Sequence, residues 1–189
     1  VTLSSYYIGQ TEVTQALWEA VMGNNPSISE GDNKPVEEVS WDDCQTFVSK
    51  LNQLTGKRFR LPTEAEWEYA CRGGKKSRGY KYSGSNTIDD VAWYYRNSSD
   101  VTHPVATKSP NELGIYDMSG NVEEWCQDWY GSYSSAAQTN PTGASSGIYR
   151  VSRGCCWSGS AKGCRSSCRN FDMLVSRFDR LGLRLVLSE

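Results

Sequence analysis

This 189-residue sequence has few histidines, no long apolar run and little net charge. Its single histidine, His103, lies in a Thr-His-Pro segment, so a metal site built from several histidines cannot form. No segment reaches the roughly 20 apolar residues that a membrane-spanning helix requires, so we expect membrane contact only through an anchor outside this chain. The net charge is −2 and no basic run is present, which argues against nucleic acid as a partner.

The cysteines do not form the pattern of a small disulfide-stabilised protein. Their number is seven, which is odd, so at least one is free or pairs outside the chain. A zinc site has little support, because the sequence has no CxxC pair and no histidine near the cysteines at its C-terminal end. The seven are Cys44, Cys71, Cys126, Cys155, Cys156, Cys164 and Cys168.

Length and periodicity predict one α+β domain over residues 1–189, rich in loops. Apolar spacing predicts a helix that carries Val13, Leu17, Ala20 and Val21 and ends at Gly23. Capping-box patterns predict a second helix from Ser40 to Gly56 and a third from Thr63 to Gly73. Short strands are expected at 122–129, 149–153 and 181–187, separated by long loops.

Several motifs run in one order along the chain. They are TEVTQALWEAVMGNNPS from Thr11, PVEEVSWDDC from Pro35, RLPTEAEWEYACRGG from Arg60, ELGIYDMSGNVEEWCQDWY from Glu112, YRVSRG from Tyr149 and GLRLV from Gly182. With these motifs the sequence resembles the formylglycine-generating-enzyme (sulfatase-modifying-factor) family nearly from end to end. The resemblance implies a C-type-lectin-like fold of the α+β class, with little regular secondary structure.

The resemblance also implies a structural calcium site. Its ligands would be the carbonyl oxygens of Asp117, Gly120 and Val122 and the carboxylate of Glu124, a set of hard oxygen donors that suits Ca²⁺. The alternative is that Glu124 is an ordinary loop carboxylate with its own hydrogen-bond partners. The carboxylates of Glu64, Glu66 and Glu68 suggest acid–base chemistry, but helix capping explains them better.

The family's enzymes oxidise a substrate cysteine with two cysteines that bind copper(I). The second of these cysteines falls at Cys164, but the first falls at Gly159, which has no thiolate to bind a soft ion. We therefore expect no copper and no enzymatic activity. The alternative is a copper-dependent oxidase in which Cys155, Cys156 or Cys168 replaces the missing cysteine.

The tail between Trp157 and Arg180 resembles the variable proteins of diversity-generating retroelements. Asparagines common in this superfamily are replaced here by scattered residue types, while a frame of residues such as Ala161, Arg165 and Arg177 is kept. The resemblance predicts a non-enzymatic receptor at the cell surface or outside the cell, with 157–180 as its variable ligand-binding surface and a protein as its ligand. The predicted ligand-binding residues are Ser158, Gly159, Ser160, Gly163, Cys168, Asn170, Phe171, Asp172, Met173, Val175, Ser176, Phe178, Asp179 and Arg180.

Two alternatives to this interpretation remain, one for the tail and one for the whole chain. Phe171, Met173, Leu174 and Phe178 would form an exposed apolar patch of the kind that marks an interaction site, or else Phe171, Leu174 and Phe178 are ordinary core residues. The whole chain could also be a structural accessory domain that neither binds a ligand nor catalyses a reaction.

Overall fold

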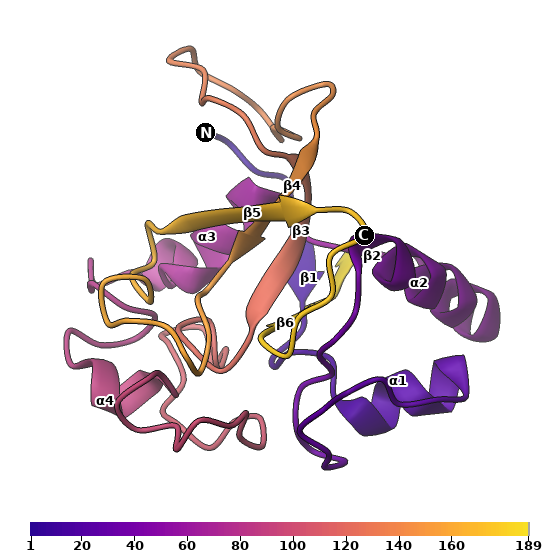
Figure 1. Ribbon diagram of the computed structural model, residues 1–189. Coiled ribbons are helices and arrows are strands. Elements are labelled where there is room, and N and C mark those ends of the chain that lie inside the picture. Colours follow the sequence, from indigo (N-terminus) through magenta and orange to yellow (C-terminus); the bar gives the residue numbers. More distant parts are fainter. Residues whose placement is uncertain (189) are drawn as a thin grey trace.

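The computed structural model describes residues 1–188 and contains short helices, short strands and long connecting segments. Figure 1 shows α1 and α2 on one side of the strands, and α3 and α4 on the other. The longest helix has 15 residues, and none in the described part of the chain is both long and apolar enough to span a membrane. The elements are β1 (Tyr6–Ile8), α1 (Gln15–Met22), α2 (Trp41–Thr55), β2 (Phe59–Arg60), α3 (Glu64–Cys71), the 3-10 helix η1 (Gly74–Lys76), α4 (Ile88–Val91), β3 (Glu123–Trp129), β4 (Tyr149–Arg153), β5 (Arg169–Met173), β6 (Leu181–Gly182) and β7 (Val186–Ser188).

The predicted helix starts at Ser40 and Thr63 are confirmed, but α1 begins at Gln15, so Val13 lies before this helix and not in it. Ser40 and Thr63 each accept a hydrogen bond from the backbone N–H three residues later, and Asp43 and Glu66 complete the two capping boxes. These caps satisfy N–H groups that have no partner inside a helix. Gly56 ends α2 with a positive φ, the conformation in which glycine has no side-chain penalty.

The buried face of α1 differs from the predicted one. Leu17 is 40% exposed, whereas Gln15 and Trp18 are buried. Trp18 stacks on Phe47 of α2 with 4.9 Å between ring centroids, which turns this side of α1 toward the core. At the end of α2, Leu54 is also exposed.

Two sheets organise the strands. One has the order β1-β7-β2 and is antiparallel; the other has the order β5-β4-β3-β6, with β3 and β6 parallel. The single strand predicted over 181–187 is therefore wrong, because β6 joins the second sheet and β7 the first. The sequence pattern also missed β5, which forms one edge of the second sheet.

Candidate ligand-binding surface

None of the fourteen predicted ligand-binding residues is buried. Those that are exposed are Ser158, Ser160, Asn170, Phe171, Met173 and Val175. Those that are half-buried are Gly159, Gly163, Cys168, Asp172, Ser176, Phe178, Asp179 and Arg180. The exposed side chains among them can change with little effect on the core, which is the property that a variable surface needs.

On one face of β5, polar residues surround the buried carboxylate of Glu123. Asn170 donates a hydrogen bond to Glu123 at 2.8 Å and Ser152 donates another at 3.1 Å. Burial raises the pKa of Glu123, and the nearby guanidinium of Arg180 opposes that rise. The predicted residues Asn170 and Arg180, which are 10 positions apart in sequence, therefore meet over one carboxylate that the sequence analysis did not identify.

On the other face of β5, the exposed ring of Phe171 joins two tyrosines. Its ring centroid lies 4.3 Å from that of Tyr130 and 4.9 Å from that of Tyr149. Met173 lies opposite Tyr149 in the register between β5 and β4 and is half exposed. This cluster extends the candidate surface onto residues outside the predicted tail.

The predicted apolar patch is wrong in part. Phe171 and Met173 are exposed, but Leu174 and Phe178 pack against the largest apolar core. The backbone explains this difference: Trp41 N–H donates to the carbonyl of Leu174, and Glu38 N–H donates to that of Phe178, which holds this segment against the start of α2.

Ion pairs fix the tail to the body of the protein. Arg169 forms a fork with Glu64 at 2.6 and 2.7 Å, and Arg177 forms one with Asp43 at 2.8 and 3.0 Å. Arg153 beside β5 is fully buried and pairs with Glu68. These contacts give the carboxylates of Glu64 and Glu68 in α3 a structural role as anchors.

Three cysteines lie together beneath the tail. A Cβ atom added to Gly159 would lie 2.1 Å from Sγ of Cys155, so the thiol of Cys155 fills the space that a side chain at position 159 would need. Cys155 has a φ of 66°, an uncommon conformation for a residue other than glycine. A hydrogen bond with the Cys156 thiol lowers the pKa of Cys155, but its contact with Cys164 and burial outweigh this and raise it to about 12. The Cys155 thiol is therefore protonated near neutral pH.

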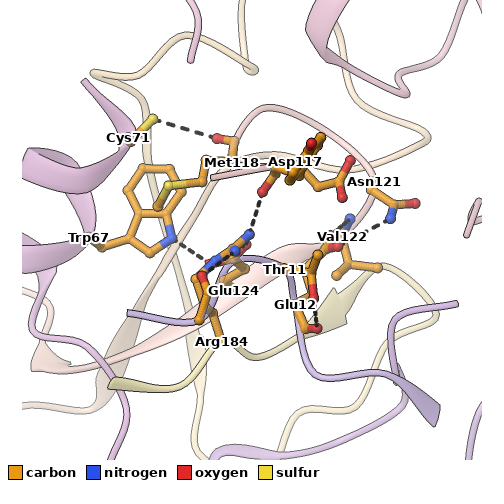
Figure 2. Close-up of polar contacts among 12 residues, drawn as sticks. Thr11, Glu12, Trp67, Cys71, Asp117, Met118, Asn121, Val122, Glu124 and Arg184 are labelled. Atoms are coloured by element: carbon orange, nitrogen blue, oxygen red, sulfur yellow. Dashed lines mark hydrogen bonds and ion pairs between the residues drawn. The ribbon is translucent and has the colours of Figure 1, made fainter. Parts of the chain in front are cut away.

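The segment expected to bind calcium surrounds a buried ion pair, shown in Figure 2. The carboxylate of Glu124 accepts a hydrogen bond from the Trp67 indole at 2.6 Å and from Arg184 at 2.7 to 3.1 Å. Both oxygens of the Glu124 carboxylate are engaged, so a calcium ion at this position would have to displace one of these donors. No cluster of three or more metal-binding side chains occurs within residues 1–188. Calcium binding stays a prediction that a direct measurement has to test.

Further buried acids surround Arg184. Its guanidinium also donates to the carbonyls of Gly9 and Tyr116 at 2.9 and 2.8 Å. Burial raises the pKa of Asp117 to about 6, and burial together with the charge of Asp117 raises the pKa of Glu12. The guanidinium of Arg184 thus supplies the positive charge that lies among the acidic side chains of Glu12, Asp117 and Glu124 in the centre of the molecule.

Comparison with known proteins places this arrangement in context. The family model described as "Sulfatase-modifying factor enzyme 1-like domain" matches residues 1–189. The chain is 41% identical to the chaperone protein LppX of Paenibacillus barcinonensis over 69% of this chain and 64% of that protein. It is 36% identical to the formylglycine-generating enzyme of Mus musculus over 75% of this chain and 40% of that protein. The chain therefore spans less than two thirds of the length of each of these two curated relatives.

Solved structures agree with the fold. Treponema denticola variable protein 1 superposes with a TM-score of 0.93 at 36% identity, covering 99% of this chain and 86% of that one. The Major Tropism Determinant U1 variant superposes with a TM-score of 0.55 at 14% identity, covering 97% of this chain and 50% of that one, a likeness of fold alone. The predicted α+β fold of the C-type-lectin-like, formylglycine-generating-enzyme type is confirmed.

Proposed function

Because the chain belongs to the sulfatase-modifying factor enzyme 1-like domain family and its backbone closely matches a variable protein, we propose that it is a non-enzymatic receptor of a diversity-generating retroelement. In this function the tail 157–180 displays diversified side chains at the cell surface or outside the cell, and the ligand is a protein. The single observation that carries the proposal is that none of the fourteen predicted variable side chains is buried.

The scaffold beneath the tail supports this function. Arg153, Cys164 and Ser166 are buried, and Arg169 is anchored by its fork to Glu64. None of these four residues is among the fourteen predicted ligand-binding residues, so these contacts do not depend on the identity of the displayed side chains. Position 159 is an exception: a side chain there requires the Cys155 thiol to move, so we expect small residues to be preferred at this position.

A pair of matched libraries tests the proposal. One library randomises Ser158, Asn170, Asp172 and Val175, and the control library randomises Arg153, Cys164, Ser166 and Gly182, which are buried. Protease resistance of the displayed variants reports folding. We expect most members of the first library to fold and most of the second to fail, and the first library should yield binders to unrelated protein targets. Similar losses in both libraries would contradict the proposal.

A second candidate function, a copper-dependent formylglycine-generating oxidase acting on a peptide cysteine, is favoured by one observation. The thiol of Cys155 lies where a side chain at position 159 would be, and it contacts Cys164. Copper(I) titration of the wild-type chain, Cys155→Ser and Cys164→Ser separates the two functions. Stoichiometric binding that both substitutions abolish, with oxygen consumption on a cysteine-containing peptide, would support the oxidase; absence of both supports the receptor.

A further inference from the structure

We propose that a protein ligand docks on this chain by adding an extended segment to the outer edge of β5. This inference rests on the proposed receptor function and specifies how the partner is held. Within residues 1–188, β5 pairs with β4 alone, over a continuous register from Arg169 opposite Arg153 to Met173 opposite Tyr149. Its other edge has no strand beside it.

The direction of the backbone groups follows from the pairing of β4. The carbonyl of Tyr149 accepts a hydrogen bond from Tyr130 N–H, in the segment that continues β3. Backbone groups of consecutive residues in a strand point to opposite sides, so Arg150 and Ser152 direct their N–H and C=O groups toward β5. There they meet Asp172 and Asn170.

The remaining residues of β5 consequently direct their backbone groups away from the sheet. These are the N–H and C=O groups of Arg169 and Phe171 and the N–H group of Met173. The carbonyl of Met173 accepts a hydrogen bond from Ser176 N–H, but no hydrogen bond joins the backbone groups of Arg169 or Phe171 to another part of residues 1–188. A regularly spaced row of donors and acceptors is left open at this edge.

The outer edge of β5 is held in position, and it lacks the usual features that prevent another strand from pairing with it. Arg169 at its start is clamped by Glu64, which keeps the strand in position. Folded proteins often block an open edge with proline, a bulge or charged side chains, lysine above all. β5 has no proline, lysine or bulge, and its two charged residues are held by other contacts: Arg169 by Glu64, and Asp172 by the nearby charge of Arg180. Instead it carries two exposed apolar side chains, Phe171 and Met173, with Val175 following at 67% exposure.

The open backbone groups of β5 determine which kind of partner can bind there. Donors and acceptors that alternate along a strand are matched by the backbone of another extended peptide, which lies about 4.8 Å away in a sheet. Such main-chain hydrogen bonds do not depend on side chains. The backbone of β5 would therefore hold many ligands, while Asn170, Phe171, Asp172 and Met173 decide which ligand binds best.

A random linear heptapeptide library on phage, selected against the immobilised chain, provides the probe. The best peptide is synthesised and its Kd is measured for the wild type, Phe171→Ala and Phe171→Pro. Both variants lose the ring, but the proline variant also loses the outward N–H and keeps the hydrogen bonds to β4. We expect at least tenfold weaker binding by Phe171→Pro than by Phe171→Ala, equivalent to about 1.4 kcal/mol for the lost main-chain bond.

A second measurement needs no variant. The selected peptide is N-methylated either at its odd-numbered or at its even-numbered residues, and both forms are tested on the wild type. One form should lose binding, because its methyl groups replace the N–H groups that face β5, and the other should still bind. Hydrogen exchange at the Phe171 amide should slow when the unmodified peptide is bound. Three results would overturn the edge-docking inference: equal binding of the peptide by Phe171→Ala and Phe171→Pro, full binding by both N-methylated peptides, or a library that yields no binders. The position libraries described above test the receptor function separately, since binders to folded targets that leave the Phe171 amide unprotected would keep that function and remove only this docking mode.

Discussion

Replacement of Arg184 by methionine gives a quantitative test of the central acid cluster. Arg184 is fully buried, compensates the carboxylate of Glu124, and donates to the carbonyls of Gly9 and Tyr116. Methionine fills much of the volume but leaves Glu124 without a counter-charge. Removal of one partner of a buried ion pair costs about 3–5 kcal/mol, which in a chain of this length lowers the melting temperature by roughly 6–20 °C.

The pH dependence of this loss identifies its cause. The guanidinium lowers the pKa of the buried Glu12, so without it the folded state of the variant binds the Glu12 proton still more tightly than the unfolded chain does. Its stability should therefore decrease as pH rises, and the deficit relative to wild type should be smaller at pH 5 than at pH 8. Thermal and urea unfolding at both pH values measure it.

A double variant serves as the control. Glu124→Gln combined with Arg184→Met removes both charges and keeps an acceptor for the Trp67 indole. We expect it to recover at least about 1.5 kcal/mol of the loss, because no buried charge is left unpaired. A deficit under about 1 kcal/mol for Arg184→Met, or an equal deficit at both pH values, would refute the compensating role of this arginine.

Four further predictions concern Asp117, Trp67, the tail and calcium. Asp117→Asn should remove about 2 kcal/mol of the stability decrease that the wild type shows as pH rises from 4 to 7, because the folded-state pKa of about 6 lies above the ordinary 3.8; an unchanged pH profile in urea unfolding would contradict it. Trp67→Ala should cost about 3–5 kcal/mol by thermal unfolding, because the indole is completely buried. Phe178→Asn should lower the melting temperature by several degrees, since this ring packs on the core, whereas a combined asparagine variant should stay within a few degrees of wild type when it replaces only Ser158, Phe171, Asp172 and Asp179. Exchange of calcium for EDTA should shift the melting temperature by less than about 2 °C, because Arg184 and Trp67 occupy the Glu124 carboxylate; a larger shift would show that a calcium ion displaces these donors.

Local sequence patterns predicted the parts of the fold that depend on neighbouring residues. The capping boxes at Ser40 and Thr63 are confirmed because their hydrogen bonds span only three residues. The long motifs identified the family, and with it the fold, because several of them occur in one order. The tail pattern likewise marked positions that the fold leaves at least partly exposed.

Side-chain packing over long sequence distances was not predictable from such patterns. Leu174 and Phe178 have the same apolar character as Phe171, yet they pack on the core because Trp41 and Glu38 bind the backbone of their segment. The carboxylate of Glu124 looked available for calcium until the fold brought Arg184 beside it from 60 residues away. Whether a carboxylate is free depends on its neighbours in space.

By itself, the sequence determined the starts of α2 and α3 and the family, because local hydrogen bonds and ordered motifs carry that information. Only the tertiary structure decided that β5 is an open edge, that the Cys155 thiol fills the space beside Gly159, and that Arg184 lies among three buried acids. The physical reason is that strand pairing, burial and charge compensation arise between residues that meet only when the chain has folded.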